Sequence, residues 1–295
     1  MDGILCVDKP QEMTSFSCCA LLRRLTGEKK VGHAGTLDPM ATGVLPLMFG
    51  KATRAIPLLP THDKQYAVTL QFGLQSDTLD CWGTVTETGR KNPTLSAIEA
   101  ALSTFRGDIL QVPPMMSALK KEGVRLYELA RQGIEVERQA RPITIYQLDI
   151  ETYDPKKREL QLVCTCSAGT YMRTLCDDLG RILGCGAVMT ALRRTEAAGY
   201  GLTDCITPDI CRDLAESGEL SARILPIETA FSVYPKVPVT AAQAVRFQNG
   251  GELSVDRVSA LPDTAEIVRI YNPEQVFLGL GKVNAESIRV LRIFV

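Results

Sequence analysis

Sixteen residues near the N-terminus, Gly32 to Leu47, constrain the fold more than any other stretch of this sequence. They hold three glycines, two prolines, one of the chain's two histidines and a single carboxylate, that of Asp38. Glycine reaches backbone angles that other residues avoid and proline fixes its own, so this density predicts a shaped active-site loop rather than a helix or a strand. An ordinary surface turn has a similar composition, because Asp before Pro is a common turn pair. Composition alone therefore leaves both interpretations open.

Length and composition indicate a globular protein. A chain of 295 residues exceeds the usual size of one domain, which predicts one large domain and a smaller one. No basic leader opens the sequence and no stretch is apolar over the length of a membrane span, so we expect a cytoplasmic protein without a membrane partner. The ten cysteines form no CxxC pair and the two histidines are not spaced as a metal pair, so we expect buried thiols and no metal.

Charge leaves the partner open. The net charge is −1, although basic residues gather between Arg23 and Arg54 and again between Lys120 and Arg141. Such clusters on a neutral protein suit a limited RNA surface, and solvated helix faces would give similar counts.

Periodicity predicts several regular elements. Tyr66 belongs to a clean alternation of apolar residues that is typical of a strand. The expected strands are 4–7, 63–73, 143–150 and 159–166, and the expected helices are 18–25 after the capping segment Thr14–Ser17, 96–105 after Thr94, and a helix that begins near 167–175 and continues to Gly180. Gly27 predicts the end of the first helix.

The order of residues is more specific than their composition. The run Gly-His-Ala-Gly-Thr-Leu-Asp-Pro-Met-Ala-Thr-Gly-Val-Leu-Pro from Gly32 closely resembles the catalytic motif of the TruB family of tRNA pseudouridine synthases. Further segments resemble the family in the same order: Asp-Lys-Pro at 8–10, Asp-Lys-Gln-Tyr at 63–66, Ser-Asp-Thr-Leu-Asp at 76–80, Gly-Thr-Tyr-Met-Arg at 169–173 and Leu-Arg-Arg at 192–194. Together the matches span nearly all of residues 3 to 227.

This resemblance implies an isomerase that converts uridine 55 in the T-loop (TΨC arm) of tRNA to pseudouridine after flipping the base, without a cofactor. The implied fold is α+β: a mixed, mainly antiparallel sheet at residues 1–230 with a helical or loop thumb at about 113–142, then a small β-rich PUA-like domain at 231–295. A generic β-barrel would give a similar C-terminal pattern. We expect tRNA as the partner, no obligate protein partner, and a monomer.

The resemblance also assigns the reacting groups. Asp38 would be the nucleophile or would remove the ribose 2′ proton, and the sequence does not choose between these roles. Arg173 would keep the Asp38 carboxylate ionised and oriented, since an adjacent guanidinium favours the charged form. Tyr66 would stack on the target base and take part in proton removal from the ring carbon, although by pattern alone it is a core aromatic. Asp77 and Asp80 would fix their loop.

Seven further residues are assigned to substrate binding by the same resemblance. His33 would occupy the position that the flipped base leaves, or would be a structural residue that bonds the loop backbone; Leu192 would line the base pocket; and Arg193 and Arg194 would face phosphates. Lys120 would contact phosphate from the thumb, or the thumb is a charged hairpin without a ligand. The complete set is Lys9, His33, Lys64, Lys120, Tyr171, Leu192 and Arg193. Glu12 and Ala168 depart from the family, which commonly has glycine and lysine there.

Three other classes share parts of this pattern. A guide-RNA-dependent relative would have the aspartate loop, but it normally lacks the thumb segment. A non-catalytic RNA-binding or folding factor would keep the surface without the chemistry, yet Asp38, Tyr66 and Arg173 are all present. A hydrolytic glycosylase would use similar carboxylate chemistry and release the base.

Overall fold

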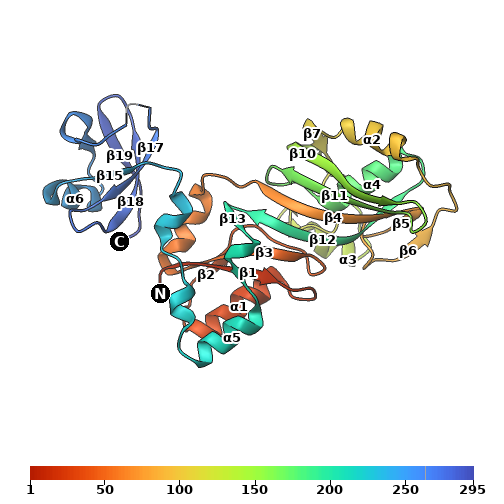
Figure 1. The fold of residues 1–295 in the computed structure, drawn as a ribbon, viewed down its shortest axis with the longest axis horizontal. Coiled ribbons are helices and arrows are strands. Elements are labelled where there is room, and N and C mark those ends of the chain that lie inside the picture. Colours follow the sequence, from red (N-terminus) through yellow and green to blue (C-terminus); the bar gives the residue numbers. More distant parts are fainter. Residues whose placement is uncertain (263) are drawn as a thin grey trace.

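A ten-stranded sheet forms the larger part of the molecule, and a five-stranded sheet lies at the opposite end (Figure 1). The computed structural model describes residues 1–262 and 264–295. The strands of the large sheet are β1 (Gly3–Lys9), β2 (Val31–His33), β3 (Thr42–Phe49), β4 (Lys64–Phe72), β7 (Gly107–Gln111), β10 (Arg141–Asp154), β11 (Glu159–Cys166), β12 (Ala187–Ala197), β13 (Tyr200–Gly201) and β14 (Cys205–Ile206).

The strand order is β14-β1-β3-β12-β4-β11-β10-β7, with β2 paired to β3 and β13 paired to β12. All of these pairs are antiparallel except β1 with β14 and β3 with β12. The predicted mixed, mainly antiparallel α+β fold is therefore confirmed. The parallel pairing of β3 with β12 matters most for function, because it brings the end of the Gly32–Leu47 stretch beside residues 193–194.

Alternation along β4 explains the main core. Tyr66, Val68, Leu70 and Phe72 are buried, while the residues between them are partly exposed. In Figure 1, α2 (Leu95–Ser103) and α4 (Met172–Ile182) lie together at the β10–β11 end of the sheet. Burial of this apolar face against the helices supplies the main driving force for the fold.

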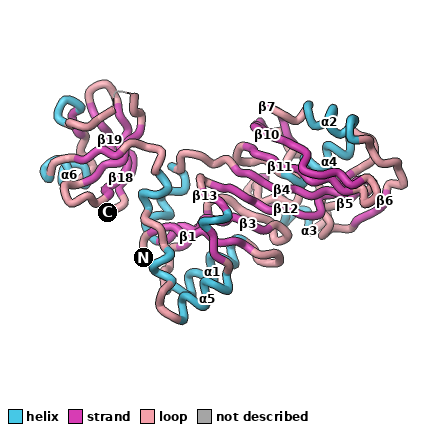
Figure 2. Tube along the Cα trace, viewed as in Figure 1, coloured by secondary structure: helices cyan, strands magenta, loops and turns pink. Residues whose placement is uncertain are grey.

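The first helix begins and ends as its sequence predicts. In α1 (Ser15–Thr26) the Thr14 side chain accepts a hydrogen bond from the backbone N–H of Ser17, and Gly27 follows with φ of +70°. α1 packs beside α5 (Pro208–Glu216), as Figure 2 shows. Because Ser15 lies in its first turn, the helix holds a polar side chain against the loop that follows β2.

The prediction of a continuous loop from Gly32 to Leu47 is wrong at both ends. β2 takes up Gly32 and His33, and β3 begins at Thr42, which leaves residues 34–41 as the irregular segment. Pro46 is accepted inside β3 because its carbonyl is the group that bonds, accepting from the Ala34 N–H at 2.9 Å. The glycine- and proline-rich stretch is thus a short loop held between two strands of the sheet.

Residues between β7 and β10 form the thumb segment. They contain β8 (Lys120–Lys121), β9 (Val124–Arg125) and one short helix, α3 (Leu126–Arg131). Apart from buried Leu126, the residues of these elements are exposed or partly exposed. Two further short strands, β5 (Leu74–Ser76) and β6 (Val85–Glu87), form a hairpin around the loop that carries Asp80.

The C-terminal part is β-rich, as predicted. Its sheet has the order β15 (Lys236–Pro238), β17 (Ile267–Tyr271), β18 (Phe277–Val283), β19 (Ser287–Ile293) and β16 (Leu253–Ser254), and α6 (Ala241–Gln248) packs against it. Phe231, Leu280 and Phe294 share one apolar cluster with Val44 and Met48 of β3, which joins this sheet to the larger one. The limits 1–230 and 231–295 themselves stay a prediction. Within the described part of the chain, no helix is long and apolar enough to cross a membrane.

Candidate active site

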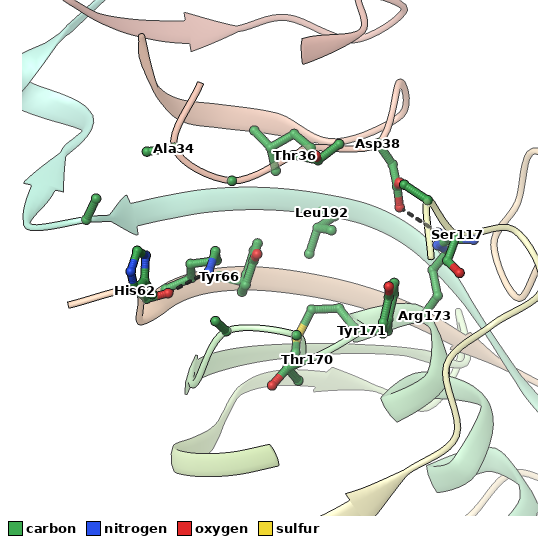
Figure 3. Close-up of a pocket in the computed structure, with 18 residues that line it drawn as sticks. Ala34, Thr36, Asp38, His62, Tyr66, Ser117, Thr170, Tyr171, Arg173 and Leu192 are labelled. Atoms are coloured by element: carbon green, nitrogen blue, oxygen red, sulfur yellow. Dashed lines mark hydrogen bonds and ion pairs between the residues drawn. The ribbon is translucent and has the colours of Figure 1, made fainter. Parts of the chain in front are cut away.

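One cavity of about 400 Å³ collects residues that are far apart in the sequence. Its walls come from the irregular segment after β2, the start of β4, the base of the thumb, the turn before α4 and the middle of β12 (Figure 3). Six of the predicted site residues line it: Asp38, Lys64, Tyr66, Tyr171, Arg173 and Leu192. The other four, Lys9, His33, Lys120 and Arg193, are absent from its lining.

Asp38 and Arg173 form the charged centre of the cavity. Arg173 Nη2 lies 2.9 Å from Asp38 Oδ2, and the arginine side chain is 5% exposed while the aspartate side chain is 39% exposed. A buried guanidinium needs partners for its remaining N–H groups. It donates to the carbonyl of Met116 at 2.8 Å and to that of Thr78 at 3.3 Å. The arginine is therefore fixed from several sides, and the carboxylate is the member of the pair that a substrate can reach.

Asp80 is the second acid at this arginine. Its Oδ2 lies 3.7 Å from Arg173 Nε, and the Asp80 side chain is 9% exposed. Its Oδ1 accepts from the Thr78 hydroxyl at 2.7 Å and from the Trp82 N–H at 3.0 Å. Asp80 thus fixes its loop as expected and also holds Arg173. Sequence reasoning missed this second contact because no spacing links the two residues.

Two buried cations hold the loop that carries Asp38. Lys9 is fully buried, and its ammonium donates to the carbonyls of Met13 at 2.7 Å, Pro10 at 2.9 Å and Pro39 at 3.4 Å. Burial lowers the pKa of Lys9 to about 8. The expectation that Lys9 binds substrate is corrected by this geometry, because all of these bonds point into the protein. Its place is under the loop, next to the backbone of the residue after Asp38.

Arg194 holds the same loop from the opposite end. It is fully buried, and its guanidinium donates to the carbonyls of Val44 at 2.7 Å, Gly35 at 3.1 Å and Thr36 at 3.3 Å. The expectation that Arg194 faces phosphates is therefore wrong. Gly43 makes this arrangement possible, because a Cβ there would lie 2.1 Å from the Arg194 carbonyl and φ is +103°.

Arg193 points away from its neighbour, since successive side chains of a strand face opposite ways. Its guanidinium pairs with Asp8 Oδ2 at 2.7 Å, and its side chain is 40% exposed. It also lies near the Thr42 hydroxyl, with Nη1 at 3.3 Å. Arg193 is thus accessible but already paired, which makes it a weaker phosphate ligand than the sequence suggested.

Tyr66 and Leu192 form the apolar floor of the cavity. They lie on the adjacent strands β4 and β12 and are 6% and 8% exposed. Burial raises the pKa of Tyr66 to about 12. The phenol is therefore neutral at physiological pH, which suits it to stacking and to donating a hydrogen bond.

The remaining predicted residues occupy three different settings. Lys64 lines the cavity, donates to the carbonyl of His62, and has its pKa lowered by burial. His33 lies at the end of β2 with its Nδ1 buried and unpartnered among the described residues, and burial lowers its pKa as well. Lys120 lines a separate cavity of about 310 Å³ within the thumb, together with Lys121 and Arg141.

Family models match this chain in three consecutive segments. The model described as TruB family pseudouridylate synthase (N terminal domain) matches residues 23–172. Those described as tRNA pseudouridylate synthase B C-terminal domain and as Pseudouridine synthase II TruB, C-terminal, match residues 173–232 and 235–294. The chain belongs to the TruB family. The resemblance found in the sequence is confirmed, and the family is one of isomerases.

TruB relatives match over nearly the whole length. The chain is 43% identical to tRNA pseudouridine synthase B of Haemophilus influenzae (strain 86-028NP), and the matched region covers 99% of this chain and 95% of the relative. It is 40% identical to tRNA pseudouridine synthase B of Syntrophomonas wolfei, over 96% of this chain and 94% of the relative. Among solved structures, a chain of "Crystal Structure of a Cbf5-Nop10-Gar1 Complex" matches with a TM-score of 0.74 at 25% identity, covering 99% of this chain and 85% of that one.

Proposed function

We propose that this TruB family member converts uridine 55 in the T-loop of tRNA to pseudouridine, with Asp38 as the reacting carboxylate. The observation that carries the proposal is the partly exposed Asp38 carboxylate, 2.9 Å from a buried Arg173, in the cavity whose floor is Tyr66 and Leu192. Support for tRNA as the substrate comes from relatives at 40–43% identity that are named tRNA pseudouridine synthase B.

The reaction exchanges one bond of uracil for another. The bond between ribose C1′ and N1 breaks, the base rotates, and a bond forms between C1′ and C5; C5 then loses a proton and N1 gains one. Asp38 serves either by attacking C1′ and leaving again, or by removing the 2′ proton and returning it. Uridine and pseudouridine are isomers, so neither route needs an oxidant or a reductant.

The protein's contribution is electrostatic and geometric. Positive charge develops on the sugar as the C1′–N1 bond breaks, and an ionised carboxylate at a fixed position stabilises it. Arg173 orients the Asp38 carboxylate through their 2.9 Å ion pair. Tyr66 supplies a flat apolar surface for the base as it turns; because its pKa is about 12, its role in the final proton loss from C5 is as a neutral hydrogen-bonding group rather than as a preformed phenolate.

The target base has to leave its stack before it reaches this cavity. Unstacking costs a few kcal/mol, which binding contacts elsewhere on the RNA must offset. Lys120 and the other thumb cations are suited to that task, since phosphate contacts provide affinity without reading sequence. His33 does not line the cavity and its Nδ1 is buried, so we assign it to supporting the loop rather than to the position that the flipped base leaves.

The decisive experiment uses the purified protein and an unmodified tRNA transcript, without guide RNA or a second protein. We expect pseudouridine at the T-loop uridine with the natural sequence and none with Asp38→Asn, which keeps the size of the side chain and removes its charge. Product that persists in Asp38→Asn would refute the role of Asp38. Free uracil would indicate a glycosylase, and tight binding without product would indicate a non-catalytic RNA-binding protein.

A further inference from the structure

Ser117 is a buried hydroxyl for which the described part of the protein supplies no partner. The residue is 5% exposed, and its Oγ has no hydrogen bond. It nevertheless lines the cavity that contains Asp38. Leaving a buried hydroxyl unpaired costs free energy, so such a group in a ligand cavity is expected to meet its partner on the ligand.

The backbone around Ser117 is held firmly, so the hydroxyl has a defined position. The Ser117 N–H donates to the carbonyl of Met115 at 2.8 Å, and its own carbonyl accepts from Tyr127 N–H at 3.1 Å. The preceding carbonyl, that of Met116, accepts from Arg173 at 2.8 Å. Ser117 is therefore tied to the arginine that orients Asp38, although it belongs to the thumb.

The neighbours of Ser117 identify which part of a nucleotide it faces. Figure 3 shows Ser117 at the end of the cavity where Asp38, Arg173 and Tyr171 meet, with Tyr66 farther along the floor. Burial raises the pKa of Tyr171, and the nearby Arg173 guanidinium opposes that rise. The base belongs over Tyr66 and Leu192, so the sugar belongs at the Asp38 end.

We propose that the Ser117 hydroxyl binds the substrate by a hydrogen bond to the 2′-hydroxyl of the target ribose. The inference rests on the proposed function, because that function brings C1′ and C2′ of the ribose to Asp38. A serine hydroxyl both donates and accepts, so it pairs with the 2′-hydroxyl whichever way that group is turned. The contact would also distinguish RNA from DNA at the reacting nucleotide.

A binding cycle tests the assignment. Two T-arm RNAs differ only in carrying uridine or 2′-deoxyuridine at the target position. The Kd of each RNA is measured for two proteins, Asp38→Asn alone and Asp38→Asn with Ser117→Ala, and the Asp38→Asn substitution prevents conversion of the uridine. With Ser117 present we expect the ribose RNA to bind more tightly. With Ser117→Ala the ratio of the two Kd values is expected to be about fivefold smaller, which is the effect of one net hydrogen bond. An unchanged ratio, including equal weakening of both RNAs, would overturn the ribose assignment.

Thr174 provides a matched control. It is also 5% exposed, its hydroxyl has no partner among the residues that the structure describes, and it does not line the cavity. Thr174→Val in the same background is expected to leave the ratio unchanged; a shift equal to that of Ser117→Ala would overturn the proposal, because loss of any buried hydroxyl would then have the same effect. With Asp38 intact, we expect Ser117→Ala to lower kcat/KM by about fivefold.

The outcomes separate this inference from the proposed function. If the protein with Asp38 and Ser117 forms no pseudouridine in the T-arm RNA, the proposed function fails and this inference fails with it. If that protein forms pseudouridine and Ser117→Ala forms it with the same kcat/KM, the proposed function stands and the role of Ser117 is refuted.

Discussion

The loop at residues 34–41 and the thumb at about 113–142 face the same cavity, but they are held in opposite ways. The loop is bonded from beneath by fully buried Lys9 and Arg194, and the Ser15 hydroxyl also bonds the backbone of Leu37 in both directions. The thumb is largely exposed and contains one six-residue helix and a hairpin of two strands with two residues each. A segment with few buried contacts opens at low free-energy cost, whereas a bonded one does not.

Under the proposed function, this difference corresponds to two different tasks at the site. A reacting carboxylate must stay within a small distance of its target, so its loop is rigid. Under the proposed function the outer part of the thumb contacts a folded RNA that must enter and leave, and its exposed, short elements permit such movement. Arg173 joins the two, because it pairs with Asp38 of the loop and donates to Met116 at the base of the thumb.

The largest expected effect comes from removing Arg194, one of the two buried cations that hold the loop. Arg194→Met leaves the carbonyls of Gly35, Thr36 and Val44 without their donor, and we expect it to lower the free energy of unfolding by about 3 kcal/mol. Urea unfolding measures the change. Arg193→Met is the control on the same strand: its exposed pair with Asp8 is worth less than about 1 kcal/mol. Equal losses in the two variants would remove the contrast between the two arginines.

A second effect follows from the pKa of Lys9, which burial lowers to about 8 from an ordinary 10.5. Between these two pH values the unfolded chain holds a proton that the folded protein has released. Stability therefore rises with pH wherever the unfolded state binds more protons. We expect the stability of the natural protein relative to Lys9→Met to be level below pH 8 and to rise from pH 8 to 10.5. A difference that stays level across that interval would show that the ammonium is solvated.

Local chemistry in the sequence predicts the elements on which this contrast rests. The capping Thr14, the terminal Gly27 and the alternation around Tyr66 each act within a few residues, and the structure has α1 and β4 where they indicate. The parallel pairing of β3 with β12 joins residues about 150 positions apart, as the Gly43–Arg194 register shows, and no local pattern encodes it. The sequence therefore predicts the individual helices and strands that form the site, but it does not predict the long-range strand pairing and hydrogen bonds that bring them together.

Two errors at the site have different physical origins. Arg193 and Arg194 were both assigned to phosphates. Successive side chains of a strand face opposite ways, so the strand period alone shows that the two arginines cannot both face the same RNA surface. The burial of Lys9 depends on carbonyls of residues 10, 13 and 39, which only the folded loop brings together. The unpartnered hydroxyl of Ser117 is likewise visible only when the cavity around it is known.

The smallest expected effect concerns the thumb. Lys120 is exposed in β8 and lines the thumb cavity, where its charge is available to phosphate. We expect Lys120→Ala to raise the Kd for tRNA about threefold to tenfold and to reduce the salt dependence of binding by about one phosphate contact, without changing the free energy of unfolding.

Lys157→Ala, in the turn between β10 and β11, is the matched control, because Lys157 is 73% exposed and does not line either the thumb cavity or the Asp38 cavity. If Lys120→Ala binds tRNA with unchanged affinity and salt dependence, the thumb is better described as a charged hairpin without a ligand. If it instead destabilises the protein as Arg194→Met does, the thumb is part of the rigid scaffold, and the division between a fixed loop and a movable cover has to be abandoned.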